Sequence, residues 1–156
     1  MVRITGAFHR VGAYFQKAIP KYEYGETREM TFSYWSLLFA ALLPLIWAAA
    51  AKMGSEGYDN HQPRVFLANL TGWPKRANWA QTNAYEAFPP FAAGVIIANQ
   101  VGANQTAIDS FAIIFLVCRI IHGIAYIADL ATFRSLIWTL GYLSTIGLFI
   151  AAGWAV

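Results

Sequence analysis

The chain has 156 residues, of which 58% are hydrophobic and only 12% are charged. Soluble domains average about 45–50% apolar and about 25% charged residues, so this composition excludes an ordinary soluble protein and indicates an integral membrane protein. The net charge of +3 is small and its basic residues flank hydrophobic segments. Such residues usually contact anionic lipid headgroups, which argues against nucleic acid as a partner.

Residues 1–30 form a basic segment that precedes the first hydrophobic stretch. Phe8, Val11, Phe15 and Ile19 recur at helical spacing, which predicts an amphipathic helix that lies in the membrane interface or binds a partner in a larger membrane complex. The alternative is a disordered tail. The segment has charges throughout and no continuous apolar core, so it does not resemble a cleavable signal peptide.

Four hydrophobic stretches are predicted to span the membrane, over residues 31–51, 76–99, 108–130 and 134–154. About 20 apolar residues are needed to cross ~30 Å of hydrocarbon, and each stretch has that length. Short connections between the later stretches predict antiparallel neighbours. Residues 31–156 are therefore predicted to form an all-α, up-down-up-down bundle of four transmembrane helices. Uncharged turns and the lack of a targeting signal are typical of a multi-pass protein of the bacterial inner membrane.

Polar side chains interrupt three of these predicted spans, and within a span they recur at helical spacing. They are Arg76, Asn83 and Glu86 in the second span, Arg119, His122 and Tyr126 in the third, and Arg134 and Ser135 in the fourth. In an up-down bundle, the start of the second span, the end of the third and the start of the fourth share one membrane face. The sequence therefore predicts that these residues converge.

Two interpretations of this convergence are open. An ion pair between Glu86 and Arg119, with Asn83 as a bridge, would lock the helices together, because either charge alone is costly in hydrocarbon. Alternatively, the cations line a pocket for an anionic ligand such as a small polycarboxylate, which arginine binds well. The loop residues Asp59 and His61 are interpreted as solvated, and no metal site is predicted.

Two motifs resemble the MAPEG family, the membrane-associated proteins in eicosanoid and glutathione metabolism. The pattern in the second span is Arg76-x6-Asn83-x2-Glu86-x2-Pro89-x-Phe91. The pattern in the third and fourth spans is Arg119-Ile-Ile-His122-Gly-Ile-Ala125-Tyr126, followed by Arg134-Ser135. The second pattern is similar to the microsomal prostaglandin E synthase and glutathione transferase branch. The resemblance covers the chain from about Phe32 to its carboxyl terminus.

The resemblance implies a homotrimer that binds glutathione between neighbouring subunits. It places Arg134 where family enzymes stabilise the glutathione thiolate, which would make it the catalytic residue. The positions that would bind or support glutathione are Arg76, Asn83, Glu86, Arg119, His122, Tyr126 and Ser135. The activity implied is that of a glutathione transferase or peroxidase that acts on hydrophobic electrophiles from the bilayer. A cation beside a thiol favours its nucleophilic, ionised form.

The chain departs from the prostaglandin synthase pattern at three positions. Trp79 and Thr82 stand where that branch carries arginines, and Trp138 replaces a tyrosine. Each charge-assisted contact that is lost removes roughly 1.5–3 kcal/mol of binding free energy. A second hypothesis is therefore a non-catalytic, lipid-binding or accessory subunit of a larger membrane complex. A third is a polar network with a purely structural role.

Overall fold

The computed structural model describes residues 29–155, so the segment predicted over residues 1–30 lies outside it apart from its last two residues. Within the described part all regular structure is helical and there is no strand, which confirms the all-α prediction. The helices are α2 (Phe32–Met53), α3 (Pro63–Ala68), α4 (Gly72–Gln100), α5 (Gln105–Ile127) and α6 (Ala131–Gly153).

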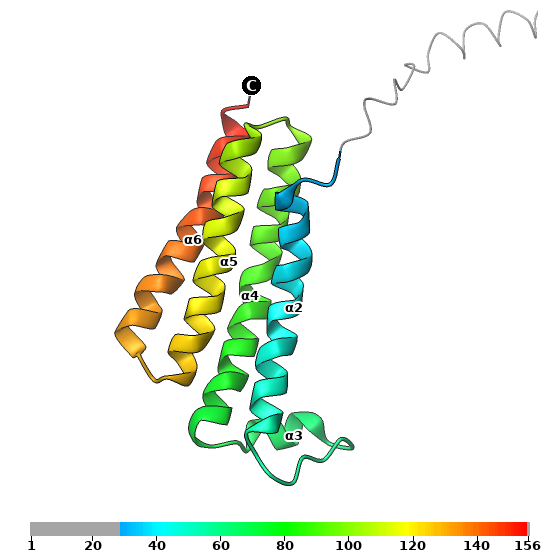
Figure 1. The fold of residues 1–156 in the computed structure, drawn as a ribbon, viewed down its shortest axis with the longest axis vertical. Coiled ribbons are helices and arrows are strands. Elements are labelled where there is room, and N and C mark those ends of the chain that lie inside the picture. Colours follow the sequence, from blue (N-terminus) through cyan, green and yellow to red (C-terminus); the bar gives the residue numbers. More distant parts are fainter. Residues whose placement is uncertain (1–28, 156) are drawn as a thin grey trace, which may run out of the picture.

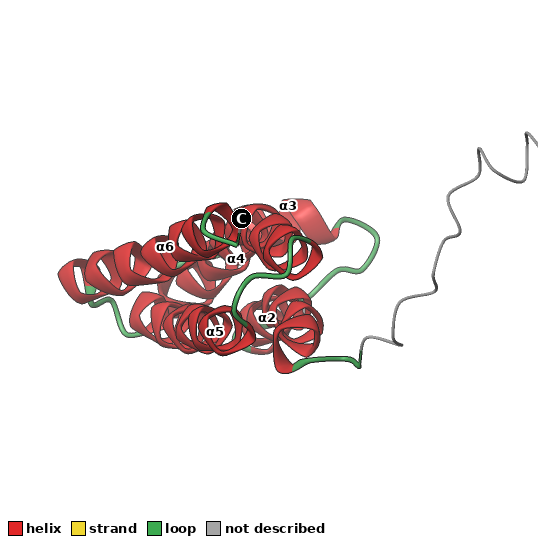
Figure 2. Cartoon of the chain, turned by 90° about the horizontal axis from the view of Figure 1, so that it is seen from above, coloured by secondary structure: helices red, strands yellow, loops and turns green. Residues whose placement is uncertain are grey.

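Four long helices lie side by side, and the short helix α3 lies beneath them in the loop between α2 and α4 (Figure 1). Seen from above, α6 and α4 form one layer and α5 and α2 the other (Figure 2). The most extensive contacts join α5 to α6 and α2 to α4, and contacts between α4 and α5 connect the two pairs. As drawn in Figure 1, the upper end holds the start of α2, the α4–α5 turn and the end of α6. The lower end holds α3 and the α5–α6 turn.

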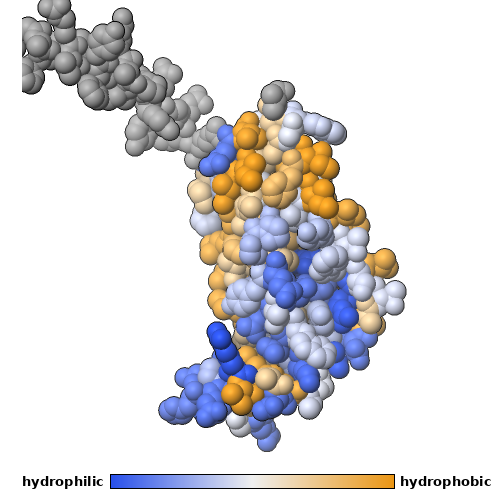
Figure 3. Space-filling model, turned by 180° about the vertical axis from the view of Figure 1, so that it is seen from behind, coloured by the Kyte–Doolittle hydropathy of each residue, from blue (hydrophilic) through white to orange (hydrophobic). Residues whose placement is uncertain are grey.

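Three of the helices, α2, α5 and α6, are long and apolar enough to cross a membrane. The chain is therefore an integral membrane protein. This agrees with the prediction that it contacts a lipid bilayer. Helix α4 is the longest, with 29 residues, but it is not among the three. Its first half carries the polar residues that the sequence places on one stripe, and a space-filling view shows one face of the molecule that is apolar above and hydrophilic below (Figure 3).

The turn between α5 and α6 differs from the predicted boundaries. Helix α5 ends at Ile127 and α6 begins at Ala131, each three residues before the predicted position. Asp129 has a φ of 61°, in the left-handed region that Asp and Asn tolerate better than most residues. The Leu130 amide donates to the carbonyl of Ala125 at 3.0 Å, which closes the helix end. One left-handed aspartate therefore ends α5 early.

The upper half contains the main apolar core. The rings of Phe91 on α4 and Phe115 on α5 stack with centroids 3.8 Å apart and planes 3° from parallel. Val95, Ile108 and Leu148 are fully buried around them. Lower down, the indole of Trp47 on α2 lies directly on Gly123 of α5, where a Cβ would overlap it. Close packing of this kind joins helices in membranes, where lipid removes much of the hydrophobic drive for association.

Helix α6 is packed along only part of its length. Every buried residue of α6 lies at or after Gly141, whereas none of residues 131–140 is buried. The first half of α6 thus leaves side chains accessible on the lower half of the molecule, next to the predicted polar residues of α4 and α5.

Candidate functional site

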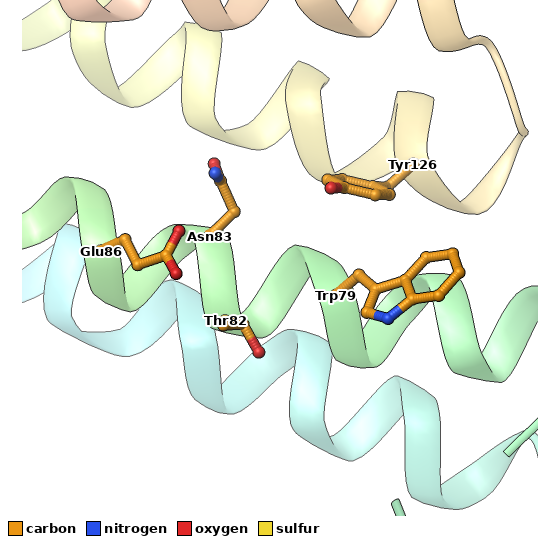
Figure 4. Close-up of a pocket in the computed structure, with 5 residues that line it drawn as sticks. All are labelled: Trp79, Thr82, Asn83, Glu86 and Tyr126. Carbon is orange, nitrogen blue, oxygen red and sulfur yellow. The ribbon is translucent and has the colours of Figure 1, made fainter. Parts of the chain in front are cut away.

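A pocket of about 290 Å³ lies between the first half of α4 and the end of α5. Helix α4 provides Trp79, Thr82, Asn83 and Glu86, and α5 provides Tyr126 (Figure 4). The α4 positions are spaced by three, four and seven residues, so one helical stripe faces the pocket. Two of the five, Trp79 and Thr82, are among the three positions where the sequence departs from the prostaglandin synthase pattern. Two of the three departures therefore fall in the pocket wall.

Arg119 lies behind this wall and is only 4% exposed. Its Nη1 donates to Oδ1 of Asn83 at 3.1 Å, and its Nη2 donates to the backbone carbonyl of Trp138 on α6 at 3.1 Å. Its Nε is buried and has no hydrogen-bond partner among the described residues. Gly141 makes room for the guanidinium, because a Cβ there would lie 2.5 Å from Nη2. Arg119 therefore joins α4, α5 and α6 through neutral partners only.

The expected ion pair between Glu86 and Arg119 is wrong. Glu86 is exposed and lines the pocket, and Arg119 donates to an amide and a backbone carbonyl instead. The one salt bridge in the described part of the chain joins Arg76 to Asp129. The charge of Arg119 is thus not balanced by a carboxylate of the described residues. A buried guanidinium without a counter-charge is costly and favours an anion nearby.

The ring of Tyr126 is the centre of an aromatic and cationic cluster at the pocket. The guanidinium carbon of Arg134 lies 4.1 Å from the ring centroid, within the range of cation–π contacts. The ring of the buried His122 meets it edge-on at 5.1 Å. The ring of Trp79 is tilted against it at 6.4 Å. The structure therefore brings Arg134, His122 and Tyr126 together from two helices.

Arg76 has a different position from the one expected. Its Nε and Nη2 donate to the carbonyl of Ile127, at 3.1 and 2.9 Å, and its Nη1 lies 3.7 Å from the carboxylate of Asp129. The last carbonyls of a helix have no partner within the helix, and a basic side chain can satisfy them. Arg76 thus caps the carboxyl end of α5 and does not line the pocket.

Ser135 also lies apart from the pocket wall. It is exposed on the first half of α6, and its hydroxyl donates to the carbonyl of Ala131 at 3.1 Å. Of the eight predicted site residues, Asn83, Glu86 and Tyr126 line the pocket. Three more contact a residue of the wall: Arg119 contacts Asn83, whereas His122 and Arg134 contact Tyr126. Arg76 and Ser135 do neither.

Sequence reasoning missed two features of this site. The Trp138 carbonyl is a backbone group, so no side-chain pattern indicates its role. Gly141 is one of several glycines on α6, and its contact with Arg119 depends on the register between α5 and α6. No metal site was predicted, and the described residues contain no group of three or more His, Cys, Asp or Glu side chains that could hold a metal ion.

These features define a class of protein: a helical membrane protein with a polar pocket beside a buried arginine. Comparison with protein families matches residues 32–154 to the MAPEG family. Since this is most of the sequence, the chain belongs to the MAPEG family. No curated protein and no solved structure matches the chain. The match is to the family as a whole, and the prostaglandin E synthase or glutathione transferase branch stays a prediction.

Proposed function

We propose that the protein is a glutathione-dependent transferase or peroxidase that acts on hydrophobic electrophiles dissolved in the bilayer. The observation that carries this proposal is the buried Arg119 beside a polar pocket, since its Nε has no hydrogen-bond partner among the described residues. Glutathione is an anionic tripeptide with two carboxylates and one ammonium group. A pocket with a nearby guanidinium, an amide and an exposed carboxylate fits those groups in kind.

Each residue has a role in this proposal. Arg119 supplies charge behind the pocket and holds Asn83 in place, and Glu86 is an acceptor for an ammonium group. Arg134, held on the Tyr126 ring, is the cation that would face the reacting thiol and favour its ionised form. Glutathione would supply the nucleophilic sulfur. His122 positions Tyr126 through its edge-on contact. Arg76 and Ser135 remain proposed ligand contacts through the family resemblance alone.

We propose that the working unit is a homotrimer. In each subunit, α4 would cross the membrane together with α2, α5 and α6. Small-molecule sites usually have volumes of about 300–1,000 Å³, so 290 Å³ is at the lower limit for a complete site. The first half of α6 has no buried residue, and Thr82 and Glu86, within the predicted second span, are exposed. A neighbouring subunit would cover these groups and complete the pocket, which would spare them contact with hydrocarbon.

A second function is supported by the composition of the pocket wall. No cation lines it, and two of its five residues are the aromatic Trp79 and Tyr126. Lys75 on α4 lies over the Trp79 ring at 5.6 Å. This wall favours an amphipathic lipid over a tripeptide. The alternative is therefore a non-catalytic, lipid-binding or accessory subunit of a larger membrane complex.

Calorimetry with glutathione on the full-length protein, in detergent and in lipid, separates the two functions. The enzyme proposal expects saturable binding and conjugation of glutathione to a chlorodinitrobenzene-type electrophile. Arg134→Ala should lower the conjugation rate by about tenfold or more, because the charge that favours the thiolate is lost. Arg64→Ala on α3 is the matched control and should not change the rate. No heat of binding in either medium overturns the enzyme proposal.

The segment of residues 1–30 is proposed to dock the protein in a larger membrane complex. Its deletion should release a co-purifying partner while the trimer stays intact, as judged by size-exclusion chromatography with light scattering. The same partners in the same amounts before and after deletion would contradict this role.

A further inference from the structure

A second pocket lies at the upper end of the molecule, far from the Arg119 site along every helix. It has a volume of about 260 Å³ and lies between the start of α2 and the α4–α5 turn. Its wall includes Glu29, Tyr34, Asn99 and Gln105. Nothing in the proposed glutathione chemistry uses this pocket.

Two residues of this wall, Asn99 and Gln105, belong to a network of hydrogen bonds around Ser33, which is 0% exposed. The Ser33 amide donates to Oδ1 of Asp109 at 3.0 Å. The Ser33 hydroxyl accepts from the side-chain amides of Asn99 and Gln105, both at 3.2 Å. The network joins α2, α4 and α5, so the pocket is held by three helices and its polar groups are fixed in place.

The network determines which polar atoms remain for a ligand. Both amide hydrogens of Gln105 are used, because its Nε2 donates to the Ser33 hydroxyl and, at 2.9 Å, to Asp109. A primary amide has two donor hydrogens, so its Oε1, an acceptor, is what Gln105 can still offer. The carboxylate of Glu29 on the pocket wall is also only an acceptor. These two groups therefore call for a ligand that donates, whereas the hydroxyls of Thr31 and Tyr34 on the same wall can donate or accept.

The charge distribution points to the same kind of ligand. Every lysine and arginine among residues 29–155 lies in the lower half of the molecule, and they are Lys52, Arg64, Lys75, Arg76, Arg119 and Arg134. The upper end contains the carboxylates of Glu29 and Asp109. The carboxyl end of α4 also reaches the pocket at Gly102, and a helix carboxyl end favours a cation. The amino ends of α2 and α5 lie at the same pocket, at Thr31 and Gln105, and they oppose the effect of the α4 end, so the preference for a cation rests on the two carboxylates.

We propose that this pocket binds the primary ammonium group of a membrane lipid headgroup, such as that of phosphatidylethanolamine. An ammonium has three donors and no acceptor, which matches the side-chain oxygen of Gln105 and the carboxylate of Glu29. The lipid is favoured over a soluble amine because Phe32 and Trp35, 41% and 47% exposed, adjoin the pocket on α2. Exposed aromatic rings at a helix end mark the membrane–water interface, which is the level of the headgroups.

Native mass spectrometry of the full-length protein in detergent, with phosphatidylethanolamine or phosphatidylglycerol added, tests this proposal. We expect the protein to retain phosphatidylethanolamine in preference to phosphatidylglycerol. Glu29→Gln should lower retention of phosphatidylethanolamine about fivefold and leave phosphatidylglycerol unchanged, since one charge-assisted contact is lost. Glu56→Gln, an exposed carboxylate in the α2–α4 loop, is the matched control and should change neither.

Competition with water-soluble phosphoethanolamine identifies the source of the ammonium group. If it displaces the lipid at similar concentrations, the pocket recognises the amine itself; if it does not, the bilayer-embedded lipid is the ligand. Both results support an ammonium site. Equal retention of the two lipids, or the same retention by the Glu29→Gln and wild-type proteins, would overturn the proposal.

Discussion

The upper half of the molecule packs apolar side chains closely. The lower half contains a buried cation, and the first half of α6 there has no buried residue. In the upper half, the rings of Phe91 and Phe115 stack, and these residues are only 0% and 2% exposed. In the lower half, Arg119 has only neutral partners and the first ten residues of α6 include none that is buried. The two halves therefore differ in how far one chain covers its own groups. The main apolar core lies in the upper half, and the polar pocket beside Arg119 lies in the lower half.

The largest expected effect tests the upper core. Phe91→Ala removes a fully buried ring. Such changes cost about 3–5 kcal/mol in soluble proteins, and about 2–3 kcal/mol is expected here because lipid solvates the unfolded helices. Unfolding in mixed detergent micelles measures the loss, and Phe39→Ala, whose ring is 51% exposed, is the matched control. If the two variants lost equal stability, the upper half would not be the stabilising core.

The next effect tests the contact between α5 and α6 at Arg119. Gly141→Ala should destabilise the protein by about 2 kcal/mol, because the new Cβ would lie 2.5 Å from Nη2 of Arg119. In an Arg119→Ala background the same change should cost less than half as much, and the difference is the coupling between the two sites. Gly153→Ala, with no neighbour within 4 Å, is the control. Additive effects would show that the two residues are not in contact.

A smaller effect is expected at the lower turn. Arg76→Ala removes the donors to the Ile127 carbonyl, which should cost about 1–1.5 kcal/mol and speed amide hydrogen exchange at the end of α5. Glutathione affinity should change less than with Arg119→Ala, since Arg119 donates to Asn83 of the pocket wall whereas Arg76 donates to the Ile127 carbonyl. A larger loss of affinity for the Arg76 variant would restore it as a ligand contact.

The smallest effect concerns the start of α2. Asp109→Asn keeps an acceptor for the Ser33 amide but removes the negative charge at this helix amino end, so about 0.5–1 kcal/mol should be lost. Asp59→Asn, in the exposed loop, is the control. Faster exchange in the first turn of α2 should accompany the loss. An unchanged first turn would mean that Asp109 does not anchor this helix.

Much of the fold follows from the sequence, because each predicted span overlaps one long helix. Length and apolar composition were enough to place α2, α5 and α6. The end of α5 was misplaced because a left-handed φ at Asp129 leaves no trace in hydropathy. The prediction of convergence located Asn83, Arg119 and Tyr126 on neighbouring helices. The sequence did not predict which of these groups form hydrogen bonds with each other. That depends on the rotation of each helix and on backbone acceptors such as the Trp138 carbonyl.

The upper polar network was missed for a related reason. Ser33 lies 66 to 76 residues before Asn99, Gln105 and Asp109, with which it forms these contacts. Each by itself suggests a helix end or a turn. Only the packing of α2 against α4 and α5 makes them one group. A charged residue within a hydrophobic segment indicates a possible site, whereas neutral amides and hydroxyls at the ends of the segment are also typical of ordinary turns.

The contact between Trp47 and Gly123 has a consequence for the evolution of the chain. Because the indole occupies the space that a side chain at position 123 would need, the two positions are not free to change independently. A descendant that acquires alanine at position 123 keeps the spacing of α2 and α5 only if a smaller residue replaces the tryptophan. Paired replacement at these two sites is therefore the expected mark of this helix contact among relatives.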